Sequence, residues 1–339
     1  MLPSRMQDLV NLHHLDIRGA DLLKEMSNGM SNLKHLNFLS DYIVGKHEEN
    51  GIRELGTLDN LHGSLCISNL ENVNNSREAL GAKIGNKKHI NILELKWDTD
   101  GEINIDDVEK ERNILNELQP HENLKELSIE GYRGEIFPDW LGLSWHSNIT
   151  KLSMNGCKNC RQLPSLGQLP SLQYLKISGL EWHFPNEFDG FPKLRSHTMK
   201  DCPELSGDLP AQLSALEELT ICQCEKLACS FSRAPKLHQL YVMGDSYPDK
   251  QQGKVVISGT QLTKSACLPH IQEPRIQKLK ISECLATATQ VLNRDTCGQV
   301  SFTDIVSIGG PSKPQDTRNL KLQSFKASSM GYFLGINFY

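Results

Sequence analysis

The chain has 339 residues, of which 38% are hydrophobic and 6% aromatic, and its formal net charge is −5. This slightly acidic composition excludes a generally basic surface, so neither nucleic acid nor an anionic membrane is an expected partner. The first residues, MLPSRMQDLVNLHHLDI, lack the apolar stretch of a signal peptide, and no later run reaches the roughly 18 apolar residues of a transmembrane helix. The sequence therefore predicts a cytoplasmic protein that does not insert into a membrane.

One short pattern recurs along the chain. An aliphatic residue, two variable residues, Leu, one residue and a second apolar residue follow one another, as in INILELKWD from Ile90, NLKELSIEGY from Asn123 and SLQYLKISGL from Ser171. The residues at the central Leu position are Leu15, Leu36, Leu65, Leu93, Leu127, Leu152, Leu175, His197, Leu219, Leu240 and Leu279. Most of them are separated by about 20 to 29 residues, so the pattern predicts about eleven leucine-rich repeats.

Apolar and polar residues alternate within each copy, which predicts a short strand with one buried face. In the copy LSMNG, Leu152 and Met154 are expected to point inward, and Lys151, Ser153 and Asn155 outward. Stacked copies place such strands side by side. The sequence thus predicts an α/β repeat fold. This fold is a leucine-rich repeat solenoid curved like a horseshoe, with a parallel β-sheet on the concave face and mostly loops, turns and short helices on the convex face.

The regularity of the repeats divides the chain. We expect a leucine-rich repeat array over residues 1–284, with an insertion at 246–270, and a degenerate or poorly ordered segment over 285–339. One helix is expected at 106–118, where DDVEKERNILNEL has a helical spacing of apolar residues. Strands are expected to be centred near Leu65, Leu93, Leu127, Leu152, Leu175, Met199, Leu219, Leu240 and Leu279.

The outward-facing strand residues form the candidate partner-binding site. They stand on rigid strands, and neighbouring repeats place them on one continuous concave surface. The tyrosines among them can bury a large area at low entropic cost. The candidate residues are Glu126, Ser128, Glu130, Lys151, Ser153, Asn155, Tyr174, Lys176, Ser178, Glu218, Thr220, Tyr241 and Met243.

The ten cysteines fit a packing role rather than a chemical one. Cys157, Cys202, Cys224 and Cys284 occupy the same repeat position, where the turn after the strand needs a small buried side chain. Cys157 and Cys160 form a CxxC pair, but a structural zinc site needs a second pair of ligands at close spacing. We therefore expect no metal site at these cysteines.

Motifs for catalysis and for other ligands are absent or incomplete. The sequence contains no G-x-x-x-x-G-K-[ST], H-E-x-x-H or G-x-S-x-G string. Asp98 and Asp100 precede a glycine as in a calcium loop, but the remaining ligands are missing. His197 replaces a core Leu and is interpreted as a tolerated core substitution. We expect a non-enzymatic protein without catalytic residues, cofactor or metal.

Several longer phrases are more specific than the generic repeat. LPSRMQDLVNLHHLDIRGADLLKEM, GIRELGTLDNLHGSLCISNLENV and LQPHENLKELSIEGYRGEIFPDWLG follow one another along the chain. From Leu2 to about Cys284, the sequence resembles the leucine-rich repeat region of plant intracellular nucleotide-binding leucine-rich-repeat (NB-LRR) disease-resistance proteins of the coiled-coil type.

The resemblance implies an interaction module of an immune receptor. It implies protein partners, namely a pathogen effector or a guarded host protein, and the nucleotide-binding switch domain that the repeats restrain. Because the phosphate-binding motif of that switch is absent from this sequence, the resemblance also implies a truncated or partial form.

Two other functions stay open at this point. An extracellular leucine-rich repeat inhibitor or receptor ectodomain would show a signal peptide and disulfide-paired caps. An F-box-type substrate adaptor for ubiquitin ligation also favours cysteine in its repeats, but it would carry an F-box before them.

Overall fold

The computed structural model divides into two compact units, Met1–Glu181 and Trp182–Tyr339, which we call unit 1 and unit 2. It describes residues 2–3, 5–20, 22–98, 105–142, 148–161, 163–180, 190–205, 213–224, 234–243, 278–282, 299–303 and 324–328. The expected insertion at 246–270 and Cys284 lie outside these residues.

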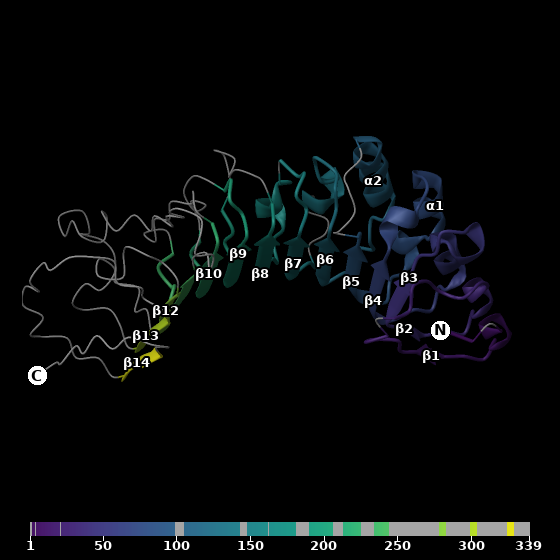
Figure 1. Ribbon diagram of the computed structural model, residues 1–339, viewed down its shortest axis with the longest axis horizontal. Coiled ribbons are helices and arrows are strands. Elements are labelled where there is room, and N and C mark those ends of the chain that lie inside the picture. Colours follow the sequence, from purple (N-terminus) through teal and green to yellow (C-terminus); the bar gives the residue numbers. More distant parts are fainter. Residues whose placement is uncertain are drawn as a thin grey trace, which may run out of the picture. The chain divides into compact units, whose positions relative to one another are not determined.

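Unit 1 is built on short parallel strands (Figure 1). Near its start, β1 (His14–Leu15) pairs in parallel with β2 (Phe38–Leu39). The following strands pair in parallel in chain order, and they are β3 (Asp41–Ile43), β4 (Gly63–Ser68), β5 (Ile90–Lys96), β6 (Glu126–Glu130), β7 (Lys151–Asn155) and β8 (Tyr174–Ser178). The strands expected in this part of the chain are confirmed.

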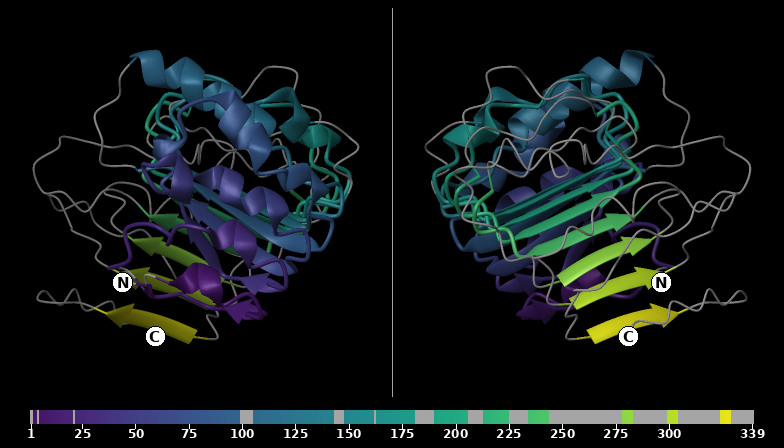
Figure 2. Two further views of the ribbon diagram at one scale, coloured as in Figure 1. Left: turned by 90° about the vertical axis from the view of Figure 1, so that its right-hand side faces the viewer. Right: turned by 90° about the vertical axis from the view of Figure 1, so that its left-hand side faces the viewer.

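Helical segments form the other side of unit 1, as Figures 1 and 2 show. The two α-helices are α1 (Ser76–Gly81) and α2 (Ile105–Glu117). The 3₁₀-helices are η1 (Met6–Asp8), η2 (Met30–Asn32), η3 (Glu48–Asn50), η4 (Ile52–Thr57), η5 (Leu70–Asn72), η6 (Ile84–Asn86), η7 (Asp139–Gly142) and η8 (Leu166–Gln168). A parallel strand ladder opposite short helices is the leucine-rich repeat solenoid, an α/β fold, that the sequence predicts.

The core of unit 1 consists of aligned rows of apolar side chains between these two layers. The first buried row is Leu65, Leu93, Leu127, Leu152 and Leu175, in register across β4 to β8. The second buried row is Ile67, Leu95, Ile129, Met154 and Ile177. Burial of each such side chain stabilises the unit by roughly 1.5 to 3 kcal/mol. A slip of one residue would expose a whole row, so the alternating pattern fixes the register.

The second repeat differs from the sequence alignment. Leu39, and not Leu36, lies opposite Leu15 in the strand pair. The segment carries buried apolar residues at every third position, including Leu33, Leu36, Leu39 and Tyr42. Any of the three leucines could have been the strand leucine. Leu36 instead fills the core from the segment before β2.

The helix expected at 106–118 is α2, at Ile105–Glu117. The helical spacing puts Val108, Leu115 and Leu118 on one face, of which Leu115 and Leu118 are buried and Val108 is half-buried. Trp140 Nε1 donates a hydrogen bond to the carbonyl oxygen of Leu115 at 3.3 Å. The carboxylate of Glu111 is also buried, and its Oε2 accepts a hydrogen bond from the backbone amide of Arg133 at 2.8 Å. These contacts hold α2 against the neighbouring repeat.

Unit 2 repeats the same parallel pairing. Its strands, each pairing with the next, are β9 (Ser196–Lys200), β10 (Glu218–Cys222), β11 (Gln239–Met243), β12 (Lys278–Ser282), β13 (Gln299–Thr303) and β14 (Ser324–Ser328). His197 lies opposite Leu219 and is only 1% exposed, so it occupies the core position that the repeat alignment indicates. The last two strands fall within the segment 285–339, whose other residues the structure does not describe.

Candidate interaction surface

The outward-pointing side chains of β4 to β8 make one surface of unit 1, which we call the strand face. Parallel pairing arranges them in rows that run from repeat to repeat. The strand face consists of Ser64, Ile92, Glu126, Lys151 and Tyr174 in the first row, Cys66, Glu94, Ser128, Ser153 and Lys176 in the second, and Lys96, Glu130 and Asn155 in the third. Most of the candidate residues of unit 1 therefore lie together, as expected from the sequence.

Polar contacts link neighbouring repeats across this face. Lys151 Nζ donates a hydrogen bond to Glu126 Oε2 at 3.0 Å. Asn155 Nδ2 donates to Glu130 Oε1 at 3.2 Å. These contacts restrain long side chains that would otherwise sample many rotamers, so part of the ordering cost of binding is already met in the free protein.

A cluster of charges around Lys96 extends the network to β5. Lys96 Nζ lies 3.0 Å from Glu94 Oε2 and 3.8 Å from Glu130 Oε2. Partial burial opposes the charged form of Lys96, but the hydrogen bond to Glu94 and the charges of both glutamates outweigh it and raise the lysine pKa. Lys96 is therefore a fixed positive centre between two carboxylates.

The strand face includes a half-buried thiol, Cys66, opposite Glu94 in the register. Burial is the main reason that the pKa of Cys66 is raised to about 12. A thiol with this pKa is protonated at neutral pH, so it is not an activated nucleophile.

Tyr174 is the large exposed aromatic residue of the strand face. It is 46% exposed and lies directly opposite Lys151 in the register of β7 and β8. Lys176 is also exposed, two residues further along the same strand. A rigid aromatic side chain between two lysines offers both apolar area and charge to a partner.

Ser178 is a correction to the expected site, because it is buried and only 5% exposed. It is the last residue of β8, and Gly179 follows with φ of 65°. A Cβ atom on Gly179 would lie 3.2 Å from the Cα atom of Gly156, so the turns of two repeats approach each other closely here. The short serine side chain does not extend past these turns, whereas the longer Asn155 in the same row stays half exposed.

The other candidate residues belong to unit 2. Glu218 is exposed, and Thr220 and Tyr241 lie opposite each other and are half-buried. The hydroxyl group of Tyr241 donates a hydrogen bond to Gln239 Oε1 at 3.0 Å. The side chain of Met243 lies outside the described residues.

Cys66, Glu94 and Lys96 are not among the residues predicted from the sequence, although they lie in the same rows as those residues. The signal was present, because LCIS and LELK alternate like every other copy of the repeat.

The cysteines after the strands have the expected packing role. Cys157, Cys202 and Cys224 are fully buried. Each thiol donates a hydrogen bond to the backbone carbonyl oxygen two residues earlier, at 3.6, 3.1 and 3.2 Å respectively. Burial also raises the pKa of Cys157, which keeps that thiol protonated. Among the described residues, no group of three or more His, Cys, Asp or Glu side chains could hold a metal ion.

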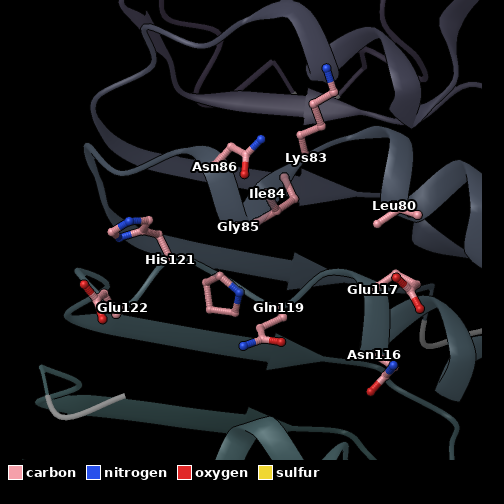
Figure 3. Close-up of a pocket in the computed structure, with 11 residues that line it drawn as sticks. Leu80, Lys83, Ile84, Gly85, Asn86, Asn116, Glu117, Gln119, His121 and Glu122 are labelled. Atoms are coloured by element: carbon pink, nitrogen blue, oxygen red, sulfur yellow. The ribbon is translucent and has the colours of Figure 1, made fainter. Parts of the chain in front are cut away.

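Unit 1 also has a hollow of about 490 Å³ on its helical side, between the ends of α1 and α2 (Figure 3). Leu80 and Ile84 supply apolar surface, and Lys83, Glu117 and Glu122 supply charges of both signs. The hollow has no row of aligned side chains comparable to the strand face. In the described part of the chain, no helix is long and apolar enough to cross a membrane.

Comparison with known proteins identifies this arrangement. The family model described as R13L1/DRL21 LRRs matches residues 52–180, which include α1, α2 and the strands β4 to β8. The chain is thus similar to the leucine-rich repeat regions of plant disease-resistance proteins. Disease resistance protein RGA2 of Solanum bulbocastanum is 32% identical over 212 residues, which cover 58% of this chain and 22% of that protein.

A disease resistance RPP13-like protein of Arabidopsis thaliana is 28% identical over 306 residues, covering 75% of this chain and 27% of the relative. The chain thus spans about a quarter of the length of these relatives. Among solved structures, the leucine-rich repeat protein LIC12759 of Leptospira interrogans has a TM-score of 0.48 and 15% identity, covering 89% of this chain and 70% of that chain.

Proposed function

We propose that this chain is a non-enzymatic protein-interaction module of a cytoplasmic plant immune receptor. It contributes to the recognition of a pathogen effector or of a host protein that the receptor guards. It also restrains the nucleotide-binding switch domain of the receptor. The similarity to plant disease-resistance proteins supports this class of function. The proposed module is the repeat array over residues 1–284.

The observation that carries the proposal is the row formed by Glu126, Lys151 and Tyr174 on adjacent strands. The strands fix the backbone, and the ion pair between Glu126 and Lys151 restrains two of the side chains. Tyr174 supplies exposed aromatic area beside them. Rigid aromatic and charged side chains at neighbouring positions are typical of the energetically dominant part of a protein interface.

The chemistry of the strand face also favours binding over catalysis. Burial raises the pKa of its thiol, Cys66. The carboxylate of Glu126 pairs with Lys151, and that of Glu130 contacts both Asn155 and Lys96. A general base or nucleophile needs a poised group with access to a substrate. The described residues of the strand face offer recognition instead.

The experiment measures binding of the purified chain to the nucleotide-binding switch domain of a plant NB-LRR disease-resistance protein. The test variant combines Glu126→Ala, Lys151→Ala and Tyr174→Ala. The matched control combines Glu109→Ala, Arg112→Ala and Asn113→Ala, which are exposed residues of α2 and change the net charge equally. Three interface truncations of about 1 kcal/mol each should weaken binding by roughly 100-fold. The control variant should bind as the wild type does.

The same two variants are then tested for binding to candidate effectors. If the strand face binds both kinds of partner, the strand-face substitutions should weaken both interactions. Loss of binding in the α2 variant, with unchanged binding in the strand-face variant, would place the interface on the helical side. Absence of binding to every switch domain and effector tested would refute the proposed function.

A further inference from the structure

A second surface of unit 1 lies at the N-terminal ends of β4, β5 and β6. It is a hollow of about 400 Å³, which we call the strand-start groove. Its lining residues are His62, Gly63, Lys88, His89, Asn91, Asn123, Lys125 and Asn148. Lysine, histidine and asparagine dominate this lining, which contains no acidic residue, and every lining side chain is exposed. None of these residues belongs to the strand face.

The walls of the strand-start groove are held in place from repeat to repeat. Asn123 Nδ2 donates a hydrogen bond to the carbonyl oxygen of Lys88 at 3.1 Å. The imidazole rings of His62 and His89 stack with centroids 4.7 Å apart and an interplanar angle of 16°. The positive and polar groups are therefore presented by a fixed scaffold, and a ligand meets them without reorganising the backbone.

The backbone amides at this edge are already used between repeats. The backbone amide of His62 donates a hydrogen bond to the carbonyl oxygen of Asn37 at 2.8 Å. The amides of Gly63 and Lys125 donate to the carbonyl oxygens of His89 and Asn91, at 3.0 and 2.9 Å respectively. Phosphate sites usually combine several free backbone N–H groups in a concave nest. Here the donors that face a ligand are ammonium, imidazole and carboxamide groups of side chains, which suit carboxylates.

We propose that the strand-start groove binds an acidic peptide segment of a protein partner, through Lys88 and Lys125. These lysines come from adjacent repeats, whose strands are about 4.8 Å apart. Alternate side chains of an extended peptide are about 6.6 Å apart, a spacing that flexible lysines on neighbouring repeats can match. The amide groups of Asn123 and Asn148 each use one hydrogen in a bond to a backbone carbonyl oxygen, and the second hydrogen of each donates to the same carboxylates. This contact is independent of the proposed strand-face interface, because the two surfaces share no residue.

The test uses the full chain and a fluorescent peptide in which Asp alternates with Ser, with binding followed by anisotropy at low salt. A peptide with Asn in place of Asp is the neutral control. The variant K88Q/K125Q should bind the acidic peptide about tenfold more weakly than the wild type, as expected for the loss of two exposed charge pairs. The control variant K46Q/K158Q removes two exposed lysines that lie after the C-terminal ends of β3 and β7, whereas the groove lies at the N-terminal ends of strands. It should change the affinity less than about twofold.

Charge reversal makes the test specific. The variant K88E/K125E should lose the acidic peptide and bind a peptide in which Lys alternates with Ser. The proposal is overturned if both lysine pairs matter equally, because the attraction is then nonspecific, or if the Asn peptide binds as tightly as the Asp peptide. It is also overturned if inorganic phosphate at millimolar concentration displaces the peptide, because the groove is then a phosphate site. Each of these outcomes leaves the strand-face experiment unaffected.

Discussion

The buried ammonium group of Lys87 donates hydrogen bonds to the carbonyl oxygens of Leu55 at 2.8 Å and Leu58 at 3.0 Å. Both carbonyls lie at the end of η4, where the Leu55 carbonyl oxygen also accepts a hydrogen bond from the backbone amide of Leu58. One side chain from the next repeat thus satisfies the end of a helical turn. This contact ties two repeats together on the helical side of unit 1.

We expect Lys87→Met to lower the free energy of unfolding by about 1 to 3 kcal/mol. Methionine fills a similar volume, but it removes the lysine donor from two buried carbonyl oxygens, of which only that of Leu55 has the backbone amide of Leu58 as a further donor. Urea unfolding followed by circular dichroism measures the change. Lys88→Met is the control, because Lys88 is exposed and should change stability by less than about 0.5 kcal/mol. Equal stability of the two variants would contradict the role of Lys87.

The same lysine predicts a pH dependence of stability. Burial lowers the pKa of Lys87 to about 8 from its ordinary value of 10.5. Between these values the unfolded chain retains the proton and the folded chain has released it, so raising the pH favours folding. The stability of the wild type relative to Lys87→Met should therefore rise between about pH 8 and pH 10. A difference that stays constant or falls over this range would show that the lysine is not desolvated.

The buried leucine rows predict a large effect of single truncations. Leu152→Ala should destabilise the protein by roughly 2 to 5 kcal/mol, because Leu152 is fully buried between two repeats. Ser153→Ala, at the next position on the strand face, should cost less than about 0.5 kcal/mol. Thermal unfolding of both variants tests the assignment of inward and outward positions. A greater loss for Ser153→Ala would reverse that assignment.

The short helix α1 depends on its N-cap. Asn75 accepts a hydrogen bond from the backbone amide of Glu78 at 3.1 Å through its side chain. Asn75→Ala should cost about 1 kcal/mol, and Asn75→Asp should restore most of it, because aspartate is an equally good cap. Hydrogen exchange of the amides in 76–81 reports the local effect. Unchanged exchange in the alanine variant would mean that packing alone holds α1.

The buried cysteines predict a pattern of thiol reactivity. Cys157 and Cys202 should react with iodoacetamide only after unfolding, because both are fully buried, and the pKa of Cys157 is raised. Cys66 is half-buried and should react slowly in the folded protein. Peptide mass spectrometry measures the three sites separately. Rapid labelling of Cys157 in the folded protein would contradict its packing role.

Much of this fold follows from local pattern. The alternation around Leu93, Leu127 and Leu152 has a period of two, and the buried row requires that period. The pattern did not predict the strand register near Leu36, because apolar residues at every third position are compatible with several strand positions. It also failed at Ser178, whose burial depends on how closely the turns at Gly156 and Gly179 approach each other. Such contacts between repeats are not encoded in one repeat alone.

The site was predictable only in part for a similar reason. Alternation identifies which residues face outward, but it does not show that Lys151 pairs with Glu126 or that Lys96 lies between two glutamates. Those contacts depend on repeat register and side-chain length. The cap of α1 was accessible from the sequence, since Asn75 is followed three residues later by Glu78, a typical helix start.

The most direct test of the central claim is hydroxyl-radical footprinting of the chain in complex with a switch domain or effector. Tyr174 on the strand face is 46% exposed, and Leu80 on the helical side is 59% exposed, so both side chains are accessible in the free protein. The proposed interface predicts that complex formation protects Tyr174 and leaves Leu80 reactive. Protection of Leu80 with unchanged reactivity of Tyr174 would contradict the account.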